Sequence, residues 1–191
     1  MSYTCLLTQF SLRLLPTNCV RACTSVPIEC SWNASNDPEE LYRAEVEFIS
    51  PNDWLKELRH LQSDLANESA SSTEYKKPET VAGMAYSKIH AVYPKQTART
   101  LAQLDPQTFL EEERVRSVLG TVRYLRAQTS TALLEQLQPL VDSREKSKGT
   151  RVMAYWPLLK VVRLYTKARA LSTGTVIVDL VSITILCDDH C

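Results

Sequence analysis

The sequence predicts an α/β protein, because strand patterns near residues 20–50 and 158–187 enclose a helical block at about 52–146. The chain has 191 residues, enough for one domain with a hydrophobic core. Its layout is therefore strands, then helices, then strands, and no internal repeat interrupts that order.

The first strand region is clearest in the stretch YRAEVEF, residues 42–48. Aromatic and aliphatic side chains occupy its even positions, and charged side chains occupy its odd positions. A period of two is typical of a strand with one buried and one wet face. Upstream, ACTSVPIECSW is rich in β-branched residues and also reads as extended, and the polar cluster NASNDPEE predicts a turn between the two.

The helical block begins with a start signal. Ser50, Pro51 and Asp53 match an N-cap, a first-turn proline and the acid of a capping box. Apolar residues follow at helical spacing: Trp54, Leu55, Leu58, Leu61 and Leu65. Residues 84–104 predict one or two short helices broken at Pro94.

A further helix is predicted from Asp105 and Pro106. Its apolar stripe consists of Phe109, Leu110, Val115, Val118, Leu119, Val122 and Leu125, with Gly120 inside it. Helical spacing continues through Leu133, Leu134 and Leu137 as far as Pro139.

Two strand patterns close the chain: LLKVVRLYT at 158–166 and TVIVDL at 175–180. The second is apolar at consecutive positions, as expected in the middle of a sheet covered by helices on both faces. It delivers a carboxylate, Asp179, to the end of a buried strand, which is where a magnesium-nucleotide site takes one. A solvent-facing strand-end aspartate is the alternative for Asp179 considered alone.

Composition excludes several function classes. The 22 basic and 22 acidic residues balance, which argues against a nucleic-acid binder with a basic groove. No apolar run reaches the ~20 residues of a membrane helix. The N-terminus has no signal-peptide pattern, so we expect an intracellular protein of the nucleus or cytoplasm. The six cysteines are then expected to be reduced. The ending CDDHC, residues 187–191, offers zinc ligands, but one short cluster does not close a tetrahedral site easily.

The segments LLPTNCVRACTSV and WPLLKVVRLYTKARALSTGTVIVDL resemble the G domain of dynamin-like large GTPases, closest to the nuclear, germinal-centre-associated type and its fungal relatives. The resemblance covers roughly residues 14–180, between a tail at 1–13 and a tail at 181–191 that do not resemble the family. It implies a P-loop GTPase-type sheet, here incomplete, with a helical insert at 52–146. It also implies that the strand at 158–166 forms a hairpin with the strand ending in Asp-Leu, and that Thr24 and Asp179 match magnesium ligands beside GTP.

Departures from the family pattern decide the functional expectation. A phosphate-binding loop needs Gly-Lys, and this chain contains no such pair. Ser182 replaces the glycine of Asp-x-x-Gly, and the guanine-reading Asn-Lys-x-Asp is absent. We therefore expect a truncated relative of a GTPase that does not itself bind GTP or magnesium and has no catalytic residue. The alternative is a non-catalytic interaction module that binds a full-length relative or another protein. The 176–180 strand is also expected to leave a hydrophobic sheet edge and marginal stability.

Overall fold

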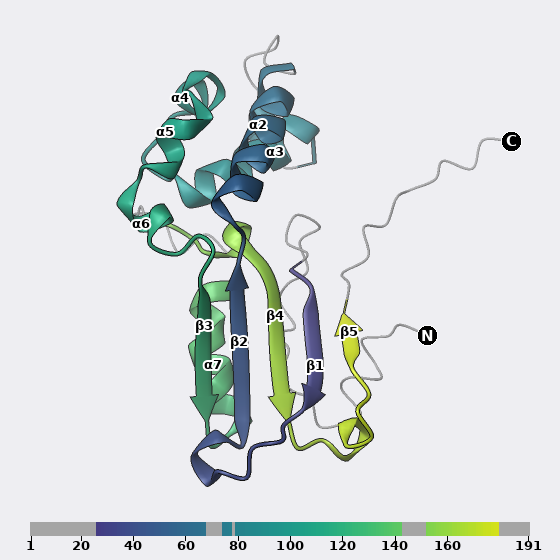
Figure 1. The fold of residues 1–191 in the computed structure, drawn as a ribbon. Helices are drawn as coiled ribbons and strands as arrows, with labels where there is room; N and C mark the ends of the chain where they lie inside the picture. The colour runs from purple at the N-terminus through teal and green to yellow at the C-terminus, as the bar shows by residue number, and fades with distance from the viewer. Residues whose placement is uncertain (1–25, 68–73, 78, 143–151, 180–191) are drawn as a thin grey trace, which may run out of the picture.

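The computed structural model describes residues 26–67, 74–77, 79–142 and 152–179, which form a mixed α/β fold built on one five-stranded sheet. The strand order is β3-β2-β4-β1-β5, as Figure 1 shows from one edge to the other. The strands are β1 (Ile28–Trp32), β2 (Tyr42–Phe48), β3 (Val122–Ala127), β4 (Leu159–Thr166) and β5 (Ile177–Asp179). The α/β class predicted from the sequence is confirmed.

The sheet is mixed in direction. β2 pairs antiparallel with both β3 and β4, β4 runs parallel to β1, and β5 pairs antiparallel with β1. The centre of the sheet is therefore made of strands from both ends of the described chain. The alternation predicted for residues 42–48 is confirmed, because Ala44, Val46 and Phe48 are buried while Glu45 and Glu47 are half-buried.

The helices occupy two places. α7 (Ser130–Val141) packs against one face of the sheet beside β3 and β2, and the other α-helices gather beyond one end of the strands (Figure 1). These are α2 (Pro51–Asn67), α3 (Val81–Val92), α4 (Ala98–Gln103), α5 (Pro106–Leu110) and α6 (Glu113–Arg116). Short 3-10 turns lie at η1 (Pro38–Glu40), η2 (Glu74–Lys76), η3 (Trp156–Leu158) and η4 (Arg169–Leu171).

The start of α2 follows the predicted capping box. The Ser50 hydroxyl accepts a hydrogen bond from the Asp53 N–H at 3.1 Å and donates one to the Asp53 carboxylate at 2.7 Å. Trp54 and Leu58 of this helix are fully buried. Two short helices, α3 and α4, lie on either side of Pro94 as predicted.

The helix predicted from Pro106 through Leu125 is wrong beyond its first half. α5 and α6 are short, and Gly120 adopts a φ of 72°, a left-handed conformation that ends the helical run. The chain then enters β3, a strand, so the helical insert predicted at 52–146 contains a strand and the sheet-covering helix α7. Val122 and Leu125 matched the helical stripe by spacing alone, although they lie on opposite faces of the strand.

Two expectations for the C-terminal strand are also wrong. β5 is an edge strand, not a central one, and Val176 and Val178 are about half exposed. It makes no hairpin with β4, because β1 lies between them and pairs with both. The predicted hydrophobic edge at this strand is present, since nothing within the described residues pairs with the outer side of β5.

Within the described residues, no helix combines the length and the apolar character needed to cross a membrane.

Candidate functional site

The structure brings one of the two predicted magnesium ligands into the fold. Asp179 is the last residue of β5 and stands opposite Ile28 of β1. Thr24 lies outside the described residues, as do Leu180, Ser182 and the CDDHC ending. The pairing of Thr24 with Asp179 therefore remains a prediction. Across the described ranges, no group of three or more His, Cys, Asp or Glu side chains is placed to hold a metal ion.

Two surface hollows in the described part of the chain are small. One, of about 30 Å³, lies over the sheet among Arg43, Tyr124, Arg126 and Tyr165. Another, of about 210 Å³, lies where the α3–α4 connection meets α6 and is lined in part by Lys95. Ligand pockets for small molecules are usually about 300–1,000 Å³. These two hollows therefore do not have the size of a typical small-molecule site.

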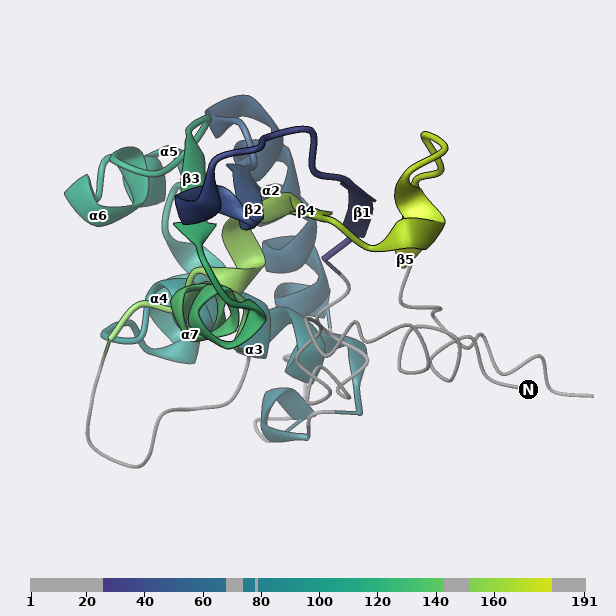
Figure 2. The same ribbon diagram turned by 90° about the horizontal axis from the view of Figure 1, so that it is seen from below.

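Our candidate for the functional site is the sheet face opposite α7, which we call the open face. Figure 2, viewed along the strands, shows α7 on one side of the sheet and no α-helix of the described chain packed flat on the other. Strand alternation places the following residues on the open face: Glu29 and Ser31 of β1, Arg43, Glu45 and Glu47 of β2, Val122, Tyr124 and Arg126 of β3, and Val161, Arg163 and Tyr165 of β4.

Arg163 is the centre of an ion network on this face. Its Nε donates to Glu29 at 3.1 Å, and its Nη1 donates to Glu47 at 2.8 Å. Lys160 also donates to Glu47, at 2.6 Å. The hydrogen bond from Lys160, followed by that from Arg163, lowers the pKa of Glu47, and Glu47 in turn raises the pKa of Arg163. The network joins three neighbouring strands, β1, β4 and β2.

A second group on the open face combines arginine with tyrosine. The Arg43 guanidinium lies 5.0 Å from the centre of the Tyr165 ring. Burial, and then a hydrogen bond with Glu45, raises the pKa of the Tyr165 hydroxyl. The Arg43 Nε is enclosed and has no hydrogen-bond partner in the described part of the chain. The ring of Tyr165 gives this cation a favourable contact in addition to any made by its other nitrogens.

At the β3 side, the open face is joined to η1. Arg126 forms an ion pair with Glu40, and Gln128 donates a hydrogen bond to Glu39 at 2.6 Å. These contacts tie Arg126 at the end of β3, and Gln128 just after it, to the 3-10 turn η1. Tyr124, by contrast, is 66% exposed. The open face thus ends in an exposed aromatic side chain at the edge of the sheet.

Sequence reasoning identified the wet face of residues 42–48 but missed its partners on the other strands. Arg163 was visible only as a charge inside an apolar strand. Its position opposite Glu45 and beside Glu29 depends on the order and register of the strands, which one sequence does not specify. The signal that was present is confined to β2, where charged side chains recur at every second position; in β3 and β4 the charged residues are three apart and give no such pattern.

The chain was compared with known proteins. No protein-family model matches it, and no curated protein is significantly similar to it.

Proposed function

We propose that this chain is a relative of the dynamin-like large GTPases that does not hold GTP itself and acts through contact with another protein. Support for the family comes from the resemblance of the segments at residues 14–26 and 156–180. Support for the loss of nucleotide binding comes from the sequence, because a triphosphate needs a lysine and several N–H donors at once, and the 191 residues contain no Gly-Lys pair.

The observation that carries the interaction role is the open face. It spans four adjacent strands, and no α-helix of the described chain packs on it. Its charges are largely paired with one another, so a partner that covers them does not have to desolvate isolated ions. A broad face of this kind suits a protein partner, whereas the hollow of about 30 Å³ on it is far smaller than a small-molecule site. The partner that the resemblance suggests is a full-length GTPase relative.

Binding of a fluorescent GTP analogue in the presence of Mg²⁺ tests the nucleotide half of the proposal. We expect no saturable binding, and no difference between the unmodified chain and the Asp179→Ala or Thr24→Ala variant. Micromolar binding that Asp179→Ala abolishes would refute this half, because Asp179 would then be a working magnesium ligand.

Co-purification with a full-length dynamin-like relative, without nucleotide, tests the interaction half. Lys160→Glu places a repelling charge beside Glu47 at the open face, and we expect it to weaken the complex. Lys56→Glu is the matched control, since Lys56 is 70% and Lys160 59% exposed and each forms an ion pair with a carboxylate. Absence of a complex, or equal weakening by both variants, contradicts a role for the open face.

A further inference from the structure

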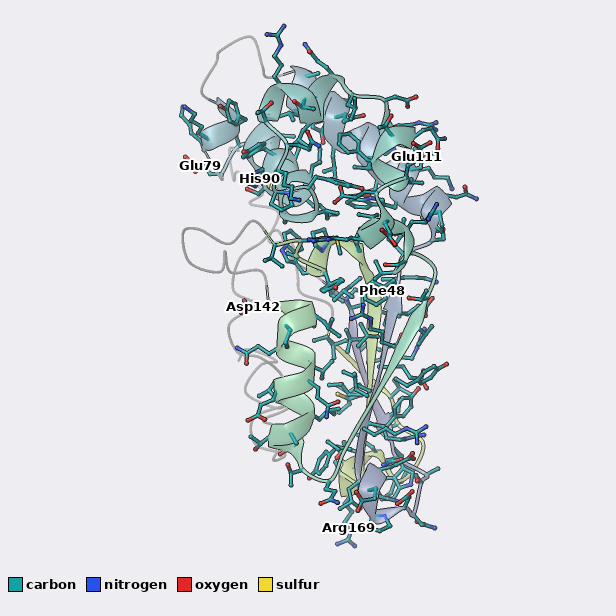
Figure 3. The ribbon with its side chains drawn as sticks, turned by 90° about the vertical axis from the view of Figure 1, so that its left-hand side faces the viewer. Phe48, Glu79, His90, Glu111, Asp142 and Arg169 are labelled. Carbon is teal, nitrogen blue, oxygen red and sulfur yellow. The ribbon has the colours of Figure 1, made fainter. Side chains whose placement is uncertain are left out.

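β3 is the outermost strand at the opposite edge from β5. It pairs with β2 on one side, and no described strand pairs with it on the other. Figure 3, which views the molecule from that side, shows β3 running along the near edge with α7 beside it and no described helix or strand in front of it. An unpaired edge is a template for one more strand.

The direction of the backbone groups along β3 follows from one hydrogen bond. The N–H of Phe48 donates to the C=O of Thr121 at 2.9 Å, so Thr121 points its carbonyl towards β2. Alternation in an antiparallel pair then turns Arg123 and Leu125 towards β2 and turns Val122, Tyr124 and Arg126 outwards. A side-chain donor outside the sheet agrees with this, because Gln136 Nε2 donates to the C=O of Arg126 at 3.0 Å.

The β3 edge lacks several of the usual protections against pairing, although the outward carbonyl of Arg126 already accepts the hydrogen bond from Gln136. The stretch VRYLRA contains no proline or lysine, and its register with β2 runs through six consecutive pairs without a shift. Val122 is 37% and Tyr124 is 66% exposed. Both arginines are engaged within their own molecule, Arg126 with Glu40 and Arg123 over the rings of Phe48 and Tyr155. Their charge is therefore partly offset by partners within the same molecule, although the Arg126 side chain stays 66% exposed.

The sequence of β3 is also compatible with pairing to itself. In an antiparallel pair related by a two-fold axis, the two buried faces lie on the same side of the combined sheet only if even-numbered residues face even-numbered ones and odd-numbered residues face odd-numbered ones. The axis must therefore pass through a residue and not between two residues. An axis at Arg123 or Arg126 sets arginine against arginine. An axis at Tyr124 or Leu125 sets no arginine against another arginine. With the axis at Leu125, each Tyr124 ring faces Arg126 of the other copy, which is a favourable cation–π arrangement.

We propose that a second copy of this chain pairs with the free edge of β3, antiparallel and about a two-fold axis at Tyr124 or Leu125, so that the two sheets become continuous. The occupant is a second copy because no arginine opposes another in these two registers, and because in the Leu125 register Tyr124 of each copy faces Arg126 of the other. This dimer goes beyond the proposed function, since it uses the edge of the sheet and not the open face, and requires no nucleotide.

Sedimentation velocity over a roughly hundredfold range of protein concentration tests the dimer. We expect concentration-dependent dimerisation of the unmodified chain. Tyr124→Pro removes an outward N–H without removing a bond to β2, and Val122→Lys places a charge on the edge. Because each change occurs twice in the dimer, each is expected to weaken dimerisation by at least about tenfold. Val178→Lys, at the β5 edge, is the matched control and should leave the dimer intact.

Circular dichroism separates loss of pairing from loss of folding. If Tyr124→Pro does not fold, Val122→Lys decides alone, because an exposed lysine is compatible with an edge strand. A chain that stays monomeric at the highest concentration overturns the proposal. So does a dimer that Val178→Lys disrupts and the β3 variants leave unchanged. Neither result bears on GTP binding, which the fluorescent analogue tests separately.

Discussion

Replacing Tyr93 by phenylalanine removes a single buried hydroxyl group that joins three helices. Tyr93 is the C-cap residue of α3 and is 1% exposed. Its oxygen accepts a hydrogen bond from Trp54 Nε1 of α2 at 3.1 Å and donates one to the C=O of Phe109 in α5, also at 3.1 Å. The Tyr93→Phe variant keeps the ring and its contact with the Phe109 ring, whose centre is 4.7 Å away.

The magnitude follows from what the variant leaves behind. The indole N–H of Trp54 and the carbonyl of Phe109 are both buried, and each loses the partner described here. A buried polar group without a partner costs about 1–3 kcal/mol, so for these two groups we expect the free energy of unfolding to fall by about 2–6 kcal/mol. Urea denaturation measures this as a lower midpoint with an unchanged m-value. Tyr124→Phe, at a residue 66% exposed, is the control and should change stability by less than about 0.5 kcal/mol.

Alkaline pH gives an independent test of the same hydroxyl. Burial raises the pKa of Tyr93 well above its ordinary value of 10.0, so the folded protein keeps this proton where the unfolded chain loses it. The stability contribution is therefore complete below about pH 10 and declines above it, by up to about 1.4 kcal/mol per pH unit. Tyr93→Phe should lose this part of the alkaline decline. Equal urea midpoints for Tyr93→Phe and Tyr124→Phe, with identical alkaline profiles, would refute the reasoning.

Two further predictions concern other parts of the fold. A glycine-to-alanine change inside a helix usually stabilises it, but Gly83→Ala should lower the melting temperature and reduce the free energy of unfolding by at least about 1–3 kcal/mol. The reason is that the added Cβ would lie 1.7 Å from the carbonyl oxygen of Lys77. A higher melting temperature contradicts this. Glu47→Gln should flatten the acid limb of stability against pH, because Lys160 and Arg163 lower the pKa of Glu47 in the folded state. The contribution of Glu47 to stability is present above its unfolded pKa of about 4.5 and is lost as pH falls through its lower folded pKa. Urea midpoints that decline identically with falling pH for the unmodified chain and for Glu47→Gln would exclude this role.

The elements that sequence reasoning identified correctly carry strong local signals. The capping box at Ser50 and Asp53 fixes the start of α2 through contacts three residues apart. The alternation of residues 42–48 fixes β2, because a buried and a wet face leave one consistent register. In both cases the physical cause lies within a few residues of the pattern, which is why one sequence is sufficient.

The errors arise where tertiary contacts override local spacing. By spacing alone, Val122 and Leu125 continue the helical stripe of apolar residues. In the structure, Gly120 has a left-handed backbone conformation that ends the helix, and the residues after it pair with β2 as a strand. The apolar run ending at Asp179 predicted a central strand, although a consecutive apolar pattern does not state how many neighbours a strand has. Of the candidate site, the sequence indicated individual charges, whereas the network around Arg163 depends on three strands coming together.

The pairing of β1 with β4 has a consequence for how the chain folds while it is being made. Arg163 and Glu29, which are hydrogen-bonded across these strands, are 134 residues apart in the chain. β1 leaves the ribosome without either of its sheet neighbours, since β4 and β5 are both synthesised later. At about 5–20 residues per second, that interval is roughly 7–27 s. During that time the side chains of β1 that are buried in the folded protein, such as Cys30, have not yet met their native neighbours on β4 and β5. β2 waits less, since its neighbour β3 is synthesised before β4, so we expect β1 to be the last of these two strands to gain a native partner.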